Sequence, residues 1–317
     1  MTLHRPILRA GADRLPADLQ LAGGWCWFDR AGIPPATLAQ MTAPRAPVAG
    51  LGMDRPRIMG ILNVTPDSFS DGGQLATIAA AVARAKGWVG VADIIDIGGE
   101  STRPGAEEVA VSAEISRVVP VIDAIRNAGI MTPISVDTRK AAVALAALSA
   151  GADMINDVSA LRFDPDMAHV VAGARVPVCL MHAQGDPGTM QKDPRYDDVL
   201  SQVFQFLAER IDHATAAGIG RDQIIIDPGI GFGKTLQHNV TLLRGLAALH
   251  GLGSPVLLGA SRKRFIGEIE QARDVTARLP GSLAVALHGV AQGVQILRVH
   301  DTVETRQALS LQQAMTG

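Results

Sequence analysis

The sequence predicts a (β/α)₈ TIM barrel preceded by a short N-terminal extension, and two observations carry this prediction. From about residue 57 onward, eight short apolar runs alternate with Ala- and Leu-rich segments of helical character. Runs such as Ile224-Ile225-Ile226 do not alternate with polar residues, which is typical of parallel strands buried on both faces. Eight such units in succession indicate a barrel, and a doubly wound open sheet is the alternative.

The predicted strands are apolar runs that end in polar or small residues. They cover 58–63, 94–98, 133–137, 153–157, 177–181, 223–227, 255–260 and 295–299. Helical spacing between them predicts helices at 78–86, 112–127, 140–150, 166–172, 196–217, 239–248, 282–292 and 303–314. A barrel places function at the carboxyl ends of its strands, and polar residues do gather there: Asn63, Asp96, Asp137, Asn156, Asp157, His182, Asp227, 261–263, Arg298 and His300.

The first 55 residues differ in composition from the rest of the chain. They contain Gly23-Gly24, Pro34-Pro35 and only short apolar runs. A length of 317 residues would suggest two domains, but a barrel of ~250 residues forms a single one. We therefore predict an extension over 1–55, either packed on the barrel or partly ordered, and a barrel over 56–317.

Composition excludes several classes of protein. The net charge of −2 gives no electrostatic reason to expect nucleic acid or an anionic membrane as a partner. No apolar stretch approaches the ~20 residues of a membrane-spanning helix, and the N-terminus lacks the apolar core of a signal peptide. The two cysteines, Cys26 and Cys179, form neither a disulfide framework nor a zinc motif. We expect a cytoplasmic protein.

Two loops near the start of the barrel carry polar residues with chemical potential. Asn63 ends the first predicted strand and precedes a long loop whose Gly and Ser residues would let it act as a lid. Arg103 lies in the loop after the second strand, where its planar fork suits bidentate contact with phosphate. A solvated surface charge is the alternative for Arg103.

Three strands end in Asp137, Asn156 and Asp227. Acids and amides around a barrel mouth suggest either a metal site or recognition of a ring with several N–H donors, because a carboxylate accepts two parallel N–H bonds. Each residue is alternatively a cap for the following helix. Asp137 suits that role well, since Thr138-Arg139-Lys140 follows it.

The later loops add glycines and cations. The segment 227–234, Asp-Pro-Gly-Ile-Gly-Phe-Gly-Lys, lacks the spacing of a nucleotide-binding P-loop, because only three residues separate Gly229 from Gly233. Ser261-Arg262-Lys263 follows the seventh predicted strand, where barrels often bind phosphate. Arg298 and His300 lie on one side of the last strand and could hold an anion together.

Six of these segments, in this order and spacing, resemble dihydropteroate synthase over roughly 57–305. Residue for residue, the matches include Asn-Val-Thr-Pro-Asp-Ser-Phe at 63–69, Ser-Arg-Lys at 261–263 and Arg-x-His at 298–300. The resemblance implies a transferase of folate biosynthesis that condenses 6-hydroxymethyl-7,8-dihydropterin pyrophosphate with p-aminobenzoate. It also implies a requirement for Mg²⁺ and a homodimer.

The resemblance further implies a role for each matching residue. Asp137, Lys263 and Arg103 would be catalytic, and Asn63 would lie at the metal. The pterin would contact Asp137, Asn156, Asp227, Lys263, Met181 and Arg298. Pyrophosphate would contact Asn63, Arg103, Arg298 and His300. The p-aminobenzoate pocket would comprise Phe69, Thr102, Pro104, Phe232, Ser261 and Lys263.

Two other functions remain open from the sequence. A pterin-dependent methyltransferase would share the pterin-binding acids, but it has no pyrophosphate for Arg103, Arg298 and His300 to hold. A catalytically silent paralogue would bind pterin without turnover, although the first two loops match the family throughout.

Overall fold

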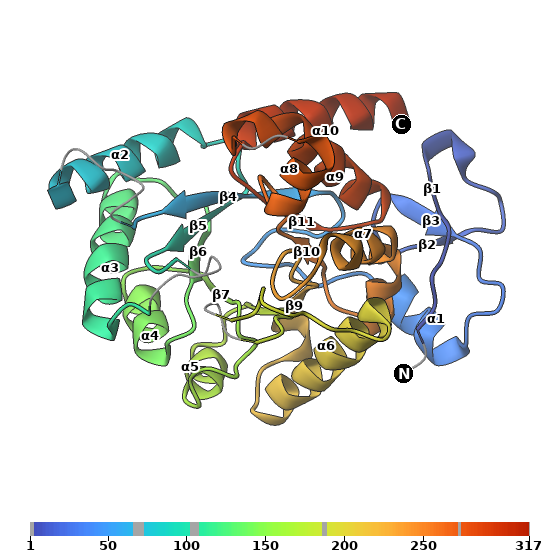
Figure 1. The fold of residues 1–317 in the computed structure, drawn as a ribbon, viewed down its shortest axis with the longest axis horizontal. Coiled ribbons are helices and arrows are strands. Elements are labelled where there is room, and N and C mark those ends of the chain that lie inside the picture. Colours follow the sequence, from blue (N-terminus) through green and yellow to red (C-terminus); the bar gives the residue numbers. More distant parts are fainter. Residues whose placement is uncertain (1–2, 66–72, 102–107, 186–188, 272–273, 317) are drawn as a thin grey trace.

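The computed structural model describes residues 3–65, 73–101, 108–185, 189–271 and 274–316. Within these ranges one central sheet has eight parallel strands: β4 (Arg57–Asn63), β5 (Ile94–Gly98), β6 (Ile134–Asp137), β7 (Met154–Asp157), β8 (Val178–Met181), β9 (Ile224–Asp227), β10 (Leu257–Leu258) and β11 (Ile296–Val299). The spatial order is β10-β11-β4-β5-β6-β7-β8-β9. A parallel bridge between Ile226 and Val256 joins the two ends of this order, so the sheet closes into a barrel (Figure 1).

Helices surround the barrel strands (Figure 1). They are α2 (Gly73–Gly87), α3 (Val111–Asn127), α4 (Ala141–Ser149), α5 (Met167–Ala174), α6 (Val199–Ala216), α7 (Leu236–Arg244), α8 (Arg264–Glu270), α9 (Leu279–Ala291) and α10 (Thr302–Thr316), with 3₁₀ turns η3 (Arg221–Gln223), η4 (Leu246–Leu252) and η5 (Thr276–Arg278). The predicted fold class is confirmed. Three predicted elements have the wrong bounds: the strand predicted at 255–260 has two residues, the helix predicted at 239–248 is α7 followed by η4, and the helix predicted at 78–86 begins at Gly73.

Local sequence explains where elements begin and how closely they pack. Asp198 caps α6 by accepting hydrogen bonds from the backbone N–H groups of Leu200 and Ser201. Gly60 lies within β4, where a Cβ would come within 2.9 Å of both Trp88 and Thr302. A glycine there lets these side chains pack directly on the strand.

Strand periodicity divides the core into two parts. Residues facing the helices, such as Ile58 and Leu62, belong to the main hydrophobic cluster. The barrel interior is filled by a second cluster with residues from seven strands: Met59, Ile94, Met154, Cys179, Ile225, Leu257 and Ile296. Val48 and Met53, which precede β4, join this cluster at the amino-terminal ends of the strands. The barrel is therefore filled and closed at that end.

The extension forms a small subdomain on the flank of the barrel (Figure 1). Its elements are β1 (Leu8–Ala10), the 3₁₀ turn η1 (Gly11–Asp13), β2 (Leu19–Gln20), β3 (Cys26–Phe28) and α1 (Pro35–Thr42), and the strands form an antiparallel sheet in the order β1-β3-β2. Phe28 and Met41 are fully buried in its core. It docks through Trp25 Nε1, which donates to the Val290 carbonyl at 2.9 Å, and Arg45 Nη2, which donates to that of His250 at 3.0 Å.

In the part of the chain that the structure describes, no helix is long and apolar enough to cross a membrane.

Candidate active site

Strand alternation brings the predicted polar residues together at one end of the barrel. Successive side chains of a strand point to opposite faces, so the residue two positions after an interior apolar residue also points inward. Two positions after the interior-cluster residues, toward the carboxyl ends of their strands, lie Asp96, Asn156, Met181, Asp227 and Arg298, so these side chains also point into the barrel. The strands thus deliver three acidic or amide groups and one guanidinium to the barrel mouth.

Arg298 links two carboxylates at the centre of this mouth. Its Nε donates to Asp96 Oδ2 at 2.6 Å, and its Nη2 donates to Asp137 Oδ2 at 2.8 Å. Burial by itself would lower the pKa of Arg298, but the two carboxylates raise it, so the guanidinium keeps its charge. Burial raises the pKa of Asp137 above its ordinary value, and Arg298 opposes that rise. The Oδ1 atoms of both aspartates are buried without a hydrogen-bond partner among the described residues.

Asp137 does not cap the following helix, contrary to one sequence-based alternative. The N-cap position of α4 is Lys140, and the Ala141 N–H donates to Asp164 Oδ2 at 2.8 Å. The Asp137 carboxylate is therefore available to the mouth, where it pairs with Arg298.

Asp227, Lys263 and Phe232 form a second group at the mouth. Asp227 Oδ1 accepts a hydrogen bond from the Gly229 N–H at 2.7 Å. The Lys263 ammonium lies 4.4 Å from the centroid of the Phe232 ring and donates to the Ile230 carbonyl. Burial lowers the pKa of Lys263 to about 8, although Asp227 raises it. A flat aromatic wall, a cation and an anion thus lie side by side.

The pair Arg262-Lys263 splits between two environments. Arg262 turns to Asp301, to which its Nε donates at 3.0 Å, whereas Lys263 turns to the mouth. Ser261 Oγ lies 3.1 Å from His300 Nδ1, so the predicted residues after β10 and β11 are neighbours. Of these two adjacent cations, therefore, only Lys263 faces the barrel mouth.

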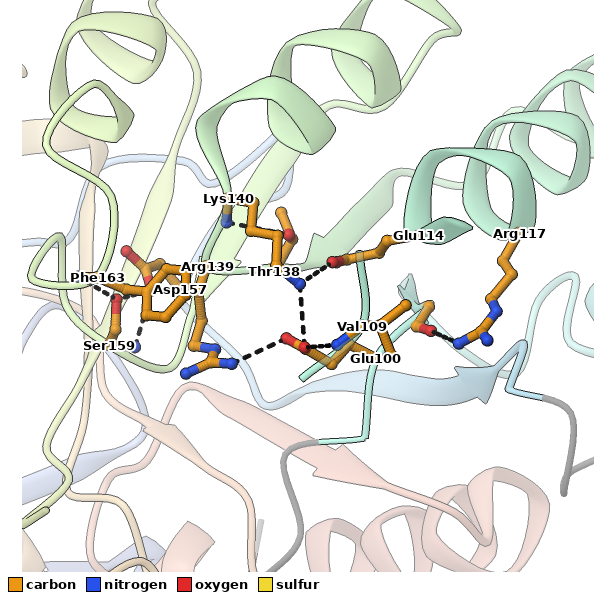
Figure 2. A network of polar contacts seen from close by, with 11 residues as sticks. Glu100, Val109, Glu114, Arg117, Thr138, Arg139, Lys140, Asp157, Ser159 and Phe163 are labelled. Atoms are coloured by element: carbon orange, nitrogen blue, oxygen red, sulfur yellow. Dashed lines mark hydrogen bonds and ion pairs between the residues drawn. The ribbon is translucent and has the colours of Figure 1, made fainter. Parts of the chain in front are cut away.

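A buried ionic network joins the segments after β5 and β6 (Figure 2). Lys140 Nζ donates to Glu114 Oε2 at 2.7 Å and to Glu100 Oε1 at 3.0 Å, and Arg139 Nη2 donates to Glu100 Oε2 at 3.1 Å. Glu100 Oε1 also accepts the Val109 N–H at 2.8 Å. The network thus fastens residues 100 and 109 to the chain that follows Asp137.

Sequence reasoning missed the role of several residues. Asp96 was recognised as a strand-end acid without a function, yet it is fully buried against Arg298. The alternation of Ile94 and Asp96 along β5 could have identified it. The Glu100–Lys140–Glu114 contacts had no local signal, because their partners lie 26 and 40 residues apart in the sequence.

The predicted site residues of the first two loops and the predicted metal residue differ in position. Phe69, Thr102, Arg103 and Pro104 lie outside the described residues. Asn63, the predicted metal residue, is the last residue of β4 and is half-buried. Among the described residues, no group of three or more His, Cys, Asp or Glu side chains could hold a metal ion.

Comparisons with known proteins identify the family of the chain. Residues 59–300 match the model of the pterin binding enzyme family. A dihydropteroate synthase of Synechocystis is 47% identical over 82% of this chain and 90% of its own, and that of Escherichia coli is 46% identical over 83% and 93%. The solved structure of a Xanthomonas albilineans dihydropteroate synthase with 4-aminobenzoic acid has a TM-score of 0.80 and 50% identity, covering 86% of this chain and 98% of that one.

These findings confirm the predicted fold class, family and enzyme class, a transferase. Because the match to the family model begins at Met59, the extension lies outside it. Because the family model covers residues 59–300 and the relatives are 46–50% identical over most of the chain, the chain belongs to the dihydropteroate synthase family of pterin binding enzymes.

Proposed function

We propose that this chain condenses 6-hydroxymethyl-7,8-dihydropterin pyrophosphate with p-aminobenzoate to give 7,8-dihydropteroate and pyrophosphate. The proposal rests on one observation: the guanidinium of Arg298 binds both Asp96 and Asp137 at the mouth of the barrel, in a chain that matches this family. A related structure from Xanthomonas albilineans contains 7,8-dihydropteroate and is 48% identical to this chain.

The pterin ring binds deepest in the mouth. The Asp137 and Asp227 carboxylates accept hydrogen bonds from N–H groups along its polar edge, and the Asn156 amide can both accept and donate there. Met181, 3% exposed, supplies an apolar contact. Lys263 donates to an acceptor of the ring, and the Arg298 plane stacks on its face.

The two remaining subsites hold pyrophosphate and p-aminobenzoate. Arg298, His300, Asn63 and Arg103 bind the anionic leaving group, and charge-assisted hydrogen bonds of this kind are strong. The p-aminobenzoate pocket uses Phe232 as a wall, with Ser261 and Lys263 toward its carboxylate. Phe69, Thr102 and Pro104 complete that pocket in this proposal.

The residues present fit a requirement for Mg²⁺. Asn63 contributes a neutral amide oxygen. A Cβ on Gly98 would lie 3.5 Å from Asn63 Oδ1 and 3.6 Å from Asp137 Cβ, so the side chains of Asn63 and Asp137 both lie beside Gly98. Mg²⁺ prefers few protein oxygens and keeps water and substrate phosphates as its other ligands. When bound, the ion would neutralise charge on the pyrophosphate.

The reaction proceeds by departure of pyrophosphate and attack by the amine. The C–O bond breaks with its electron pair on the leaving group, whose negative charge Arg298 and Arg103 stabilise. Asp137 offsets the positive charge left on the pterin, and the buried mouth limits access of water. The lone pair of the aromatic amine then forms the C–N bond, and the amine proton passes to solvent. No covalent enzyme intermediate is required.

We further propose a cytoplasmic homodimer. Helix α10 exposes Val303, Leu311 and Met315, whose exposed fractions are 56%, 61% and 72%, and these apolar side chains favour a partner surface there. Cys26 and Cys179 are both free thiols, as suits a reducing compartment. Light scattering of the purified protein tests the dimer, and a monomer at micromolar concentration would exclude it.

The decisive test of activity is product formation by the purified chain. Dihydropterin pyrophosphate, radiolabelled p-aminobenzoate and Mg²⁺ should yield labelled dihydropteroate, and a chelator should abolish the product. Absence of product while calorimetry still detects pterin binding would point to a silent paralogue. Binding of methyltetrahydrofolate under those conditions would instead indicate a methyltransferase.

A further inference from the structure

The backbone between Asp227 and Lys234 packs directly against the chain that follows β8. Gly229, Gly231 and Gly233 have φ values of +66°, +83° and +61°. A Cβ at Gly229 would collide with the His182 carbonyl oxygen, and one at Gly233 would collide with that of Gln184. The glycines at 229 and 233 leave no room for side chains of their own. Hydrogen-bond donors for the carbonyl groups of this segment must therefore come from residues elsewhere in the chain.

Side-chain donors reach every carbonyl from residue 229 to residue 233. Lys234 Nζ donates to the Gly229 carbonyl at 2.9 Å and to the Phe232 carbonyl at 3.0 Å. The other three carbonyls accept from three further side chains: Ile230 from Lys263, Gly231 from Gln191 and Gly233 from Tyr196. Because buried carbonyls without partners are unfavourable, these donors fix the shape of the 229–233 backbone.

Lys234 makes three close contacts with a single ammonium group. It is 3% exposed, and its third contact is His182 Nδ1 at 2.9 Å. As an ammonium, Lys234 has three N–H donors, and the two carbonyls and the His182 ring nitrogen occupy them, with the His182 carbonyl a longer contact at 3.4 Å, so none remains for a substrate. Burial lowers the pKa of Lys234, and Asp227 opposes that change. For Nδ1 to accept, the His182 ring must be neutral with its proton on Nε2. Burial lowers the pKa of His182 to about 2, which agrees with a neutral ring.

We propose that Lys234 and His182 are positioning residues that hold Phe232 and Lys263 in place for the aromatic amine substrate. The inference rests on the proposed function, in which both of those residues face p-aminobenzoate. The Lys263 ammonium sits over the Phe232 ring and donates to the loop itself, so a shift of the loop moves both. Of the proposed pterin partners, Asp137 and Asn156 belong to β6 and β7 and lie outside this loop, whereas Asp227 and Lys263 contact it. A shift of the loop should therefore weaken pterin binding less than p-aminobenzoate binding.

The test compares Lys234→Met with the wild type. Methionine retains an unbranched side chain as far as Cε and removes the amino group with its donors. We expect the KM for p-aminobenzoate to rise about tenfold, while the dissociation constant of the pterin substrate, measured by calorimetry, changes less than about threefold. Lys86→Met, on the exposed side of α2, is the matched control for loss of one lysine and should leave both constants unchanged. Equal losses in both constants, or no loss in either, would overturn the proposal.

A second variant covers the case in which Lys234→Met does not fold. Tyr196→Phe removes the donor to Gly233 and keeps the ring that packs 4.9 Å from His238. It should raise the same KM by about threefold, and an unchanged KM would contradict the proposed role of the loop.

Nitrogen-15 NMR of His182 at pH 7 tests the contact without any assay of activity. The proposal requires an unprotonated Nδ1 and a protonated Nε2 in the wild type, and the opposite tautomer would refute it. This measurement also separates the two proposals. If the wild type makes no dihydropteroate, the proposed function fails, whereas the tautomer still reports whether Lys234 donates to His182.

Discussion

Arg298 on β11 and Asp137 on β6 form an ion pair of 2.8 Å although 161 residues separate them in the sequence. The same guanidinium holds the fully buried Asp96 at 2.6 Å. One side chain therefore balances two interior carboxylates, and it couples the stability of the barrel mouth to the function proposed for it.

The Arg298→Met variant should lose both activity and stability. Removing one partner of a buried pair leaves uncompensated charge, so we expect the free energy of unfolding to fall by about 3–5 kcal/mol in urea titrations. Adding Asp96→Asn should restore part of that stability by removing one of the two stranded carboxylates, without restoring turnover. Recovery of turnover in the double variant would contradict the role of Arg298 at pyrophosphate.

Asp137→Ala should remove most turnover. The carboxylate is proposed to bind the pterin and to offset charge that develops on it, so we expect kcat/KM to fall by about 10²–10³-fold. Asp164→Ala, which removes the carboxylate beside the first turn of α4, serves as a control for a lost aspartate outside the mouth. Wild-type rates in Asp137→Ala would refute the assignment.

Lys263 should impose an alkaline limit on activity. Its pKa is lowered to about 8 by burial, so the ammonium is present below that pH and is lost as the pH rises through it. We therefore expect kcat/KM to decline above about pH 8. In Lys263→Arg the charge persists and the decline should move to higher pH, whereas Lys263→Ala should weaken binding of both substrates. An unchanged pH profile in Lys263→Arg would exclude Lys263 as its source.

The buried network of Figure 2 should be stabilising only while it is complete. Lys140→Met strands Glu114, which is fully buried, and should lower the free energy of unfolding by about 3–5 kcal/mol. Lys140→Met combined with Glu114→Gln should recover part of this loss. The exposed pair Arg264–Glu268 is the control, because Arg264→Met should change stability by less than about 1 kcal/mol. Equal effects at the two pairs would contradict the importance of burial.

Phe28 should be essential to the docked extension. It is fully buried in the core of that subdomain, so Phe28→Ala should cost about 3–5 kcal/mol of the stability of the extension, measured by hydrogen exchange. Ile7→Ala, at a position 79% exposed, should have little effect. Unchanged protection of the 19–42 backbone in Phe28→Ala would show that the extension does not depend on this core.

Local patterns were sufficient to predict the barrel but not all of its pieces. Continuous apolar runs such as 224–226 marked the strands because parallel strands are buried on both faces. The seventh strand is shorter than predicted, because only Leu257 and Leu258 pair as a ladder before the chain reaches the turn at residues 261–262. Helix α8 was not predicted. It has seven residues, and its N-cap residue, Lys263, makes no side-chain cap.

The candidate site was predictable one strand end at a time, but its pairings were not. Nothing near Arg298 in the sequence identifies Asp96, since the two meet only when the barrel closes. Lys234 was hidden for a different reason. It ends a glycine-rich segment that looks like a phosphate loop, whereas in the fold its ammonium faces backbone carbonyls.

The extension also gives the protein an internal optical reporter. Two of the three tryptophans of the protein, Trp25 and Trp27, lie in that subdomain, and the indole of Trp25 is hydrogen-bonded to the barrel. The third, Trp88, is 6% exposed and packs on β4. Intrinsic fluorescence therefore reports chiefly on separation of the extension, while far-ultraviolet circular dichroism follows the barrel. Any gap between the two melting curves measures how independently the subdomain detaches.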